Sequence, residues 1–339
     1  MLAIAGRNRP GPRERFERRY RKYYENNPHG PPSIFFARDN ESGAVVGMTA
    51  LFPTRLRVAG QLLPAAIGGD FAVDADHRGL GPAVPLQRAT TSVLSERGLK
   101  CAYGSPNSSS EPIIGRAGYT DAARLTRFVK LLTARPLVDR YIRRPRLAGL
   151  ASAAANPVVS VLSRERLYRR SARFSVEQPD EFDARFDGLW ELARRHLGAT
   201  SERSADLLNW RYEKTGPAEG GRDYSIFTLV DGKDVAGYVV YRVDHDTRLV
   251  YDIVHLPDRP VIDALLSEFI LDSRDSEAAA IDLGYVGPSN LLSARLRAFG
   301  FLQSTAQNGL RVFVDGEAPF GVDLLRRDSW YFLTGDTDF

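Results

Sequence analysis

Two stretches of the chain show the same succession of hydrophobic and polar patterns. In each, apolar β-branched and aromatic runs flank a short glycine-containing turn, which predicts β-hairpins over residues 34–59 and 225–243. After a further strand, apolar residues recur at helical spacing. These are Val84, Leu86, Ala89, Val93 and Leu94 in the first stretch and Ile262, Leu265, Leu266, Phe269 and Ile270 in the second. Each stretch therefore predicts the order helix, hairpin, strand, helix, strand, helix, strand.

Short matches also follow one another in the same order along the two stretches. Asp70 to Val73 corresponds to Asp252 to His255, and Ala117 to Tyr119 corresponds to Phe299 to Phe301, each at an offset of 182 residues. We infer a diverged tandem repeat. The expected fold class is α/β (α+β), with two related units that each have a mixed central sheet flanked by helices.

The connection between the two stretches differs from both in composition. Residues 131–175 are rich in Arg, Pro and Ala and match neither copy. We predict a first unit over residues 1–133, a basic connector over 134–174 and a second unit over 175–339. A length of 339 residues fits two domains better than one.

Composition narrows the class of protein. Apolar residues make up 43% of the chain and charged residues 26%, as in soluble globular proteins. Cys101 is the single cysteine, which favours a reducing compartment, and we expect it in the core. The N-terminal apolar run is too short for a signal peptide, and the longest uncharged stretch is shorter than the ~20 residues that cross a bilayer. We expect a cytoplasmic protein and no metal site.

Basic residues are concentrated in two segments. Residues 7–22 carry a net charge of +6 and residues 135–173 a net charge of +8, in a chain whose net charge is +4. Such segments are either solvated helix faces or surfaces for an anionic partner, such as coenzyme phosphates or lipid headgroups. No nucleic-acid-binding motif accompanies them, so no nucleic-acid partner is expected. Contact with a membrane surface and the oligomeric state both stay open.

Residues 71–83 read as a strand, a polar turn and a glycine-containing entry to a helix. Gly79 and Gly81 would let an anion approach the backbone. The first N–H groups of the helix, together with its dipole, favour a phosphate at this position. The alternative is a strand-turn-helix corner that binds nothing.

The run Arg78-x-x-Gly81-x-Ala83 resembles the Arg/Gln-x-x-Gly-x-Gly/Ala signature of the GNAT acyltransferases, at the place where that family has it, after its fourth strand. Residues 103–107 resemble the family's fifth strand and the following turn, and residues 115–119 resemble the close of its fourth helix. The resemblance covers residues 34–130 well and residues 200–305 faintly. It implies an N-acyltransferase that transfers an acyl group from acetyl-CoA or another acyl-CoA to a small-molecule amine or a peptide. Amino sugars, amino acids and peptides are all possible acceptors.

The resemblance also implies which residues bind the coenzyme. The pyrophosphate would lie on the N–H groups of residues 79–83, and the pantetheine arm would pair with the edge of the preceding strand and with the residue that follows the next strand. The implied cofactor-binding residues are Phe71, Ala72, Val73, Arg78, Gly79, Leu80, Gly81, Ala83 and Asn107.

Catalysis requires a base for the amine and a donor for the departing thiolate. Asp70 is the first candidate base, since it adjoins the expected coenzyme strand, and Glu111 is the second. The family often has an acid tyrosine four residues before the glycine that closes its fourth helix, and this position is Ile114 here. Ser108, its neighbouring serines, Tyr103 or water would then protonate the thiolate.

The second unit lacks the features of the phosphate site. The positions aligned with Gly79 and Gly81 are Val261 and Asp263. A carboxylate in the first helical turn would satisfy the N–H groups and repel a phosphate. We therefore predict one coenzyme per chain. The second unit would instead form a wall of the acceptor cleft, with Trp210, Arg211 and Tyr212 as the acceptor-binding residues.

Three other functions remain open on the sequence alone. A Fem-type aminoacyl transferase has the same doubled architecture and uses aminoacyl-tRNA, which the basic segments would face. A non-catalytic acyl-CoA-binding protein would account for Ile114. A peripheral membrane enzyme acting on a lipid-linked sugar would use the basic connector.

Overall fold

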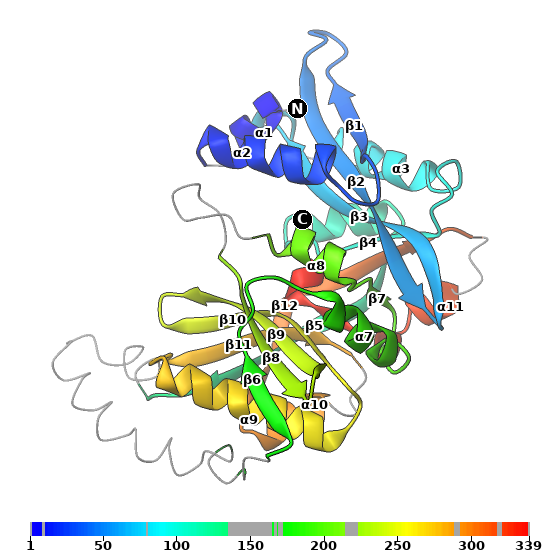
Figure 1. Cartoon of the computed structure of the whole chain (residues 1–339). Helices are drawn as coiled ribbons and strands as arrows, with labels where there is room; N and C mark the ends of the chain where they lie inside the picture. Colours follow the sequence, from blue (N-terminus) through cyan, green and yellow to red (C-terminus); the bar gives the residue numbers. More distant parts are fainter. Residues whose placement is uncertain are drawn as a thin grey trace, which may run out of the picture.

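The strands of both halves of the chain join one mixed sheet. The computed structural model describes residues 2–8, 11–78, 81–134, 165, 168, 172–213, 223–287, 292–316 and 321–337. Within them, 13 strands form the sheet, with the order β1-β2-β3-β4-β12-β5-β11-β10-β9-β8-β6 (Figure 1). The short strands β7 and β13 pair with β2 and β11. The predicted α/β class is confirmed.

The elements follow the order that the sequence predicts. The first half contains β1 (Ser33–Arg38), β2 (Val45–Val58), β3 (Gln61–Val73), β4 (Cys101–Gly104), β5 (Thr120–Leu131), α1 (Leu2–Asn8), α2 (Arg13–Tyr20), the π-helix η1 (Arg21–Glu25), the 3-10 turn η2 (Ala75–His77), α3 (Ala83–Ser92) and α4 (Glu111–Arg116). The strands of the second half are β6 (Phe174–Glu177), β7 (Thr200–Ser201), β8 (Ser225–Asp231), β9 (Asp234–Asp244), β10 (Thr247–His255), β11 (Ala280–Val286), β12 (Leu302–Val314) and β13 (Phe332–Leu333). Its helices are α7 (Ala184–Ala193), α8 (Ala205–Arg211), α9 (Arg259–Asp275), α10 (Leu292–Ala298), α11 (Gly321–Leu324) and the 3-10 turns η5 (Arg327–Ser329) and η6 (Thr334–Asp336).

Each half contributes one strand to the other. β12 lies between β4 and β5, and β5 lies between β12 and β11. Outward from the central β12–β5 pair, the order is β4, β3, β2, β1 on one side and β11, β10, β9, β8 on the other. Residues of β12, although far along the chain, therefore lie next to β4 and can reach a site built on β3 and β4.

Helices bury the predicted apolar faces against this sheet. In α3, Val84 and Leu86 are buried, and in α9 the apolar positions that predicted the helix are all buried. Figure 1 shows α3 beside the strands of the first half and α9 along those of the second. Cys101 is buried, as predicted, and burial raises the pKa of its thiol to about 12. None of the described helices is long and apolar enough to cross a membrane.

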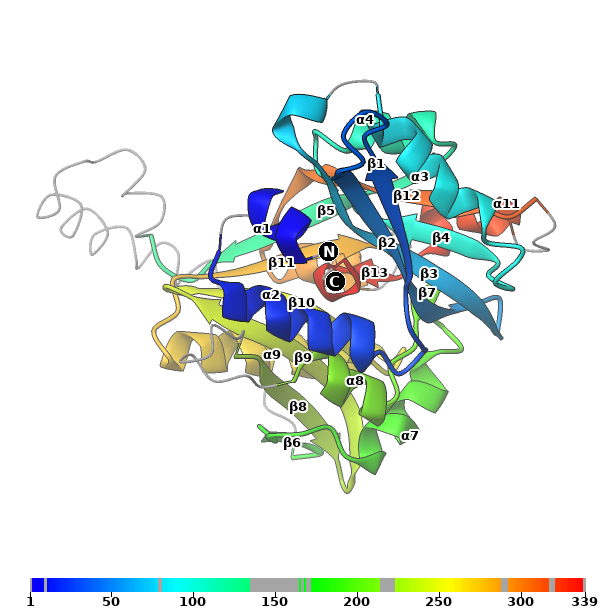
Figure 2. The ribbon, with the colours of Figure 1, turned by 90° about the horizontal axis from the view of Figure 1, so that it is seen from above.

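The predicted connector, residues 134–174, lies mostly outside the described residues. Glu165, one of its described members, is buried and pairs with Lys130 and Arg274. At the N-terminal side, α2 runs across the junction of the two halves next to α8 (Figure 2). Several basic residues of the segment 7–22 bind carboxylates of the same chain, such as Arg7 with Asp74.

Candidate active site

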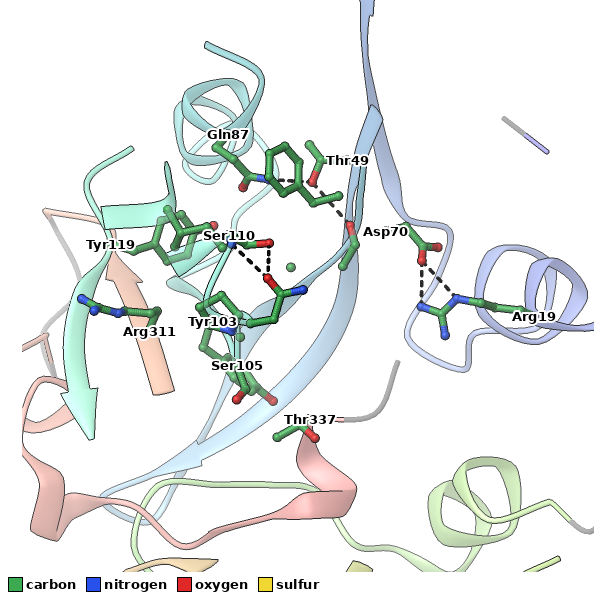
Figure 3. A pocket seen from close by; sticks show the side chains of 17 residues that line it. Arg19, Thr49, Asp70, Gln87, Tyr103, Ser105, Ser110, Tyr119, Arg311 and Thr337 are labelled. Carbon is green, nitrogen blue, oxygen red and sulfur yellow. Dashed lines mark hydrogen bonds and ion pairs between the residues drawn. The ribbon is translucent and has the colours of Figure 1, made fainter. Parts of the chain in front are cut away.

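Strands β3 and β4 pair at one end and part at the other. They are parallel and pair from Ala65 to Ile67 with Cys101 to Tyr103, and β3 continues to Val73 without further pairing to β4. A Cβ at Gly104 would lie 3.4 Å from the carbonyl oxygen of Gly68, so the backbones are still close where they part. A cavity of about 220 Å³ lies at this point (Figure 3).

A β-bulge shapes the β3 side of the cavity. The register between β2 and β3 shifts opposite Thr49, and Asp70 has a φ of +51°. Such a bulge re-aims side chains along one strand. The carboxylate of Asp70 accepts hydrogen bonds from Tyr24 Oη at 2.6 Å and from Arg19, whose Nη2 lies 3.0 Å away. The first candidate base thus lies at the cavity, but both of its oxygens are engaged by α2 and η1.

The other two predicted catalytic residues do not line the cavity. Ser108 is exposed and lies outside the lining. Glu111 accepts a hydrogen bond of 2.6 Å from Arg311, and this bond, with the charge of the arginine, lowers the pKa of the Glu111 carboxyl. It is Arg311, from β12, that lines the cavity.

Two hydroxyl groups on the β4 side have buried oxygens that find no hydrogen-bond partner in the described part of the chain. They are Tyr103 Oη and Ser105 Oγ, and both residues line the cavity. Burial and the charge of Asp336 raise the pKa of Tyr103, so its phenol keeps its proton over the neutral range. Both side chains lie on the side of the cavity where Thr337 lies (Figure 3).

The α3 side of the cavity is also polar. Gln87 is buried on α3 and donates to Thr49 Oγ1 at 3.1 Å. Tyr119 shares a hydrogen bond of 3.2 Å with Thr90, and burial raises its pKa to about 12. The lining residues that the sequence did not indicate as part of a site include Gly68 and Gly69 and the side chains of Arg19, Thr49, Gln87, Tyr119, Arg311 and Thr337.

The predicted phosphate site lies at the start of α3. Gly79 and Leu80 are outside the described residues, whereas Arg78, Gly81 and Ala83 are within them. No described side chain caps α3, and its first turn contains no acidic residue. A Cβ at Gly81 would meet nothing within 4 Å. The uncapped helix start and the open space at Gly81 fit an incoming phosphate.

The predicted coenzyme-binding residues near the cavity use some of their polar groups in bonds within the protein and leave others open to a ligand. Ala72 and Val73 pair with β2 through one edge, and their other edge faces the gap left by β4. Asn107 accepts hydrogen bonds from the backbone N–H groups of Ser109 and Ser110 through Oδ1, which leaves its amide nitrogen as a donor at the cavity. Arg78 donates to the carbonyl of Val73 at 3.1 Å and supports the turn from within.

Comparisons with known proteins agree with this geometry. Residues 5–122 match the family model described as an acetyltransferase (GNAT) domain. Residues 5–122 are thus a GNAT acetyltransferase domain. No curated protein matches the chain.

Solved structures share the fold of nearly the whole chain at low sequence identity. A probable N-acyltransferase from Enterococcus faecalis V583 is 14% identical, with a TM-score of 0.66 over 92% of this chain and 69% of that one. A GCN5-related N-acetyltransferase from Anabaena variabilis is also 14% identical, with a TM-score of 0.63 over the same shares. One from Kribbella flavida has a TM-score of 0.60 at 14% identity, over 92% of this chain and 67% of that one. The GNAT domain and this fold support an acyltransferase.

In the second half, β10 and β11 also part, as β3 and β4 do at the cavity of the first half (from here on the GNAT cavity), but the chain itself fills the gap. β10 and β11 are parallel and pair only as far as Val250 and Leu283. Beyond this point β13 pairs with Tyr285 and Val286 of β11, and Tyr331 donates a hydrogen bond to the carbonyl of Ile253 on β10. A Cβ at Gly335 would lie 2.8 Å from the carbonyl oxygen of Tyr251, so no space remains there.

The argument from Asp263 is wrong in its detail. α9 begins at Arg259, so Asp263 lies in the second turn and not in the first. Its carboxylate pairs with Arg295 and Arg259 instead of the helix N–H groups. The sequence alignment misplaced it because α9 starts earlier in its unit than α3 does. The aligned segment Pro288 to Asn290 lies outside the described residues.

The three predicted acceptor-binding residues lie away from the cavity lining. Trp210 packs on Tyr23 with ring centroids 5.5 Å apart, and Tyr212 is buried in the core of the second half. Arg211 is buried and pairs with Asp336 at 3.1 Å. None of the three lines the cavity between β3 and β4, whereas Trp210 lines a separate cavity with residues of α2 and η1.

Arg211 belongs to a buried cluster of four charges. Arg203 contacts Asp252 at 3.0 Å and Asp336 at 2.8 Å. Each of the four side chains is at most 5% exposed. Asp336 also accepts hydrogen bonds from Ser201 and from the N–H group of Leu333. The cluster fixes the position of η6. It therefore also fixes Thr337, which follows η6 and lines the GNAT cavity.

Proposed function

We propose that the chain transfers an acyl group from an acyl-CoA to the amine of a small molecule or peptide. The observation that carries this proposal is the parting of β3 and β4, which leaves one edge of residues 68–73 without a strand partner beside a cavity. Unpaired backbone groups next to a cleft can pair with an extended ligand. Coenzyme A would supply the activated thioester, and the described residues bind and orient it.

The coenzyme would be held at two places. Its phosphates would lie on the N–H groups at the start of α3, near Gly81, where none of the described side chains caps the helix. The pantetheine arm would extend along Phe71 to Val73 and accept a hydrogen bond from Asn107 Nδ2. This arrangement brings the thioester to the cavity.

Tyr103 is proposed as a hydrogen-bond donor to the reacting thioester. Its phenol is 1% exposed and its oxygen has no partner in the described part of the chain. Because its pKa is raised, Tyr103 would donate a hydrogen bond and keep its proton, and the departing thiolate would take its proton from water. A preorganised donor in a dry site stabilises developing negative charge on oxygen or sulfur. Ser105 is the second such donor.

Asp70 remains the proposed base, since it is the only carboxylate among the described residues that line the cavity. To accept the amine proton, the Asp70 carboxylate would have to contact the acceptor amine beside Arg19 and Tyr24, which donate to its Oδ1 and Oδ2. Proton transfer requires direct hydrogen-bond contact between base and amine.

The second half is proposed to be a diverged copy that binds no coenzyme, because β13 and η6 fill its cleft. Its contribution to the reaction would be β12, which brings Arg311 to the cavity.

The test is an assay of free thiol release with a panel of acyl-CoAs against amino sugars, amino acids and peptides. Turnover that requires both substrates and yields the acylated amine supports the proposal. Binding of acyl-CoA without turnover for any amine would favour an acyl-CoA-binding protein. Aminoacyl-tRNA serves as an alternative donor, and transfer from it alone would replace acyl-CoA as the donor.

A further inference from the structure

A second cavity, of about 210 Å³, lies at the carboxyl end of β11. Its described lining comes from β5, β11, β12, α10 and η5, and includes no residue of β10. It therefore lies on the opposite side of β11 from the cleft that β13 and η6 fill. None of its lining residues belongs to the lining of the GNAT cavity.

The floor of this second cavity contains a polar group without a partner. Ser293 is 6% exposed, and its Oγ has no hydrogen-bond partner in the structure as described. Leaving a buried hydroxyl without a partner costs about 1–3 kcal/mol. Phe128, 1% exposed, also lines the cavity. A ligand that hydrogen-bonds to Ser293 would remove this cost.

The rim of the second cavity is cationic. Arg297 donates to Gln303 at 3.1 Å and Arg327 donates to Thr126 at 3.1 Å, and both are exposed. Neither arginine makes an ion pair with a described carboxylate. Asp328 is the one carboxylate of the described lining, so two positive charges face one negative charge. The two hydrogen bonds to neutral partners hold the guanidinium groups at the rim without neutralising them.

We propose that this second cavity binds a small oxyanion, a carboxylate or a phosphate monoester, between Arg297 and Arg327, with Ser293 Oγ as a third donor. Guanidinium groups suit planar bidentate contacts with such oxyanions. Asp328 sets the orientation of the ligand, because its carboxylate repels the anionic group, which then lies near the two arginines. The size of the cavity admits a small metabolite and excludes a whole coenzyme A molecule.

The experiment uses the full chain and measures its thermal midpoint at fixed ionic strength against rising concentrations of inorganic phosphate and, separately, acetate. A ligand that binds only the folded state raises the midpoint in a saturable way. We expect saturation with at least one probe, and the probe that saturates identifies the oxyanion.

Three variants locate the binding. Arg297→Gln and Arg327→Gln should each weaken the apparent Kd by about tenfold or more, and Ser293→Ala by a smaller factor. Arg326→Gln is the matched control, since Arg326 is exposed and lies outside the lining. The proposal is overturned if neither probe saturates, or if the three variants bind as the wild-type protein does, which would place the anion elsewhere, for example at the start of α3.

Discussion

Arg19 on α2 and Asp70 on β3 form an ion pair of 3.0 Å at the wall of the GNAT cavity. Their side chains are 22% and 9% exposed, so the pair is shielded from bulk water. It joins α2 to the bulge of β3, and Figure 3 shows the Asp70 carboxylate turned toward Arg19. Asp70 can therefore act as a base, as an anchor for α2, or as both.

Asp70→Asn should lower kcat by at least about tenfold and leave the Kd for CoA within a factor of about 2, since a base acts on the acceptor amine. The loss should shrink as pH rises and the amine deprotonates without help. Arg19→Gln is the matched variant, because it breaks the same ion pair and keeps the carboxylate. Steady-state kinetics over a range of pH will separate the two roles. Equal losses in both variants, with parallel pH profiles, would leave Asp70 as an anchor only.

Gly81→Asp should abolish CoA binding with little change in the free energy of unfolding. Gly81 has no positive φ, and a Cβ there meets open space, so the fold tolerates a side chain. The carboxylate would repel the phosphates at the start of α3. Calorimetric titration with CoA measures the effect.

Two controls accompany this variant. Gly81→Ala adds bulk without charge and should weaken CoA binding less. Gly188→Asp adds the same charge on α7, at an exposed position that is equally open, and should bind CoA normally. Normal CoA binding by Gly81→Asp would remove α3 from the coenzyme site.

Local patterns predicted the helices and strands and some of the residues that line the described cavity. Asp70 and Gly81 could be selected from the sequence because both belong to one continuous strand-turn-helix segment whose local pattern suggests a phosphate site. Arg311 and Thr337 could not be found in this way, because they reach the cavity only through the placement of β12 next to β4 and of η6 between the two halves. Likewise, the residues around Arg211 in the sequence do not indicate that its side chain is buried against Asp336. Long-range strand pairing and buried ion pairs depend on tertiary structure, which periodicity does not contain.

Acid should destabilise the fold through His255. It is buried, and burial lowers the pKa of its imidazole. Because the unfolded chain then binds more protons, the stabilisation is present above the ordinary histidine pKa of about 6.5 and is lost as pH falls below it. His255→Gln should flatten the dependence of the free energy of unfolding on pH below about 6.5, by up to about 1.4 kcal/mol per pH unit.

Denaturant unfolding at a series of pH values measures this dependence. His245→Asn is the control, since His245 lies in an exposed turn with a φ of +55° that asparagine tolerates. An unchanged slope in the His255 variant would show that another group governs the acid response.

Saturation with CoA should occur at one site per chain. β13 and η6 occupy the second cleft, where Tyr331 bonds to the carbonyl of Ile253, and Trp330 and Phe332 in the same segment are buried. A coenzyme could enter only if this segment left the core. Native mass spectrometry counts the bound molecules, and two CoA molecules per chain would contradict the asymmetric arrangement.

Arg211→Ala should destabilise the fold and not act on the acceptor directly. Its side chain is 5% exposed and pairs with Asp336, and removing one partner of a buried ion pair costs about 3–5 kcal/mol. Arg127→Ala is the control, since Arg127 pairs with Asp282 at 2.6 Å but is 55% exposed, and such surface pairs contribute about 1 kcal/mol or less. Chemical denaturation compares the two variants. Because Asp336 adjoins Thr337 at the cavity, the folded Arg211 variant should also lose kcat while its KM for the acceptor stays close to the wild-type value. A raised acceptor KM with unchanged stability would instead support the acceptor-binding role that the sequence suggested.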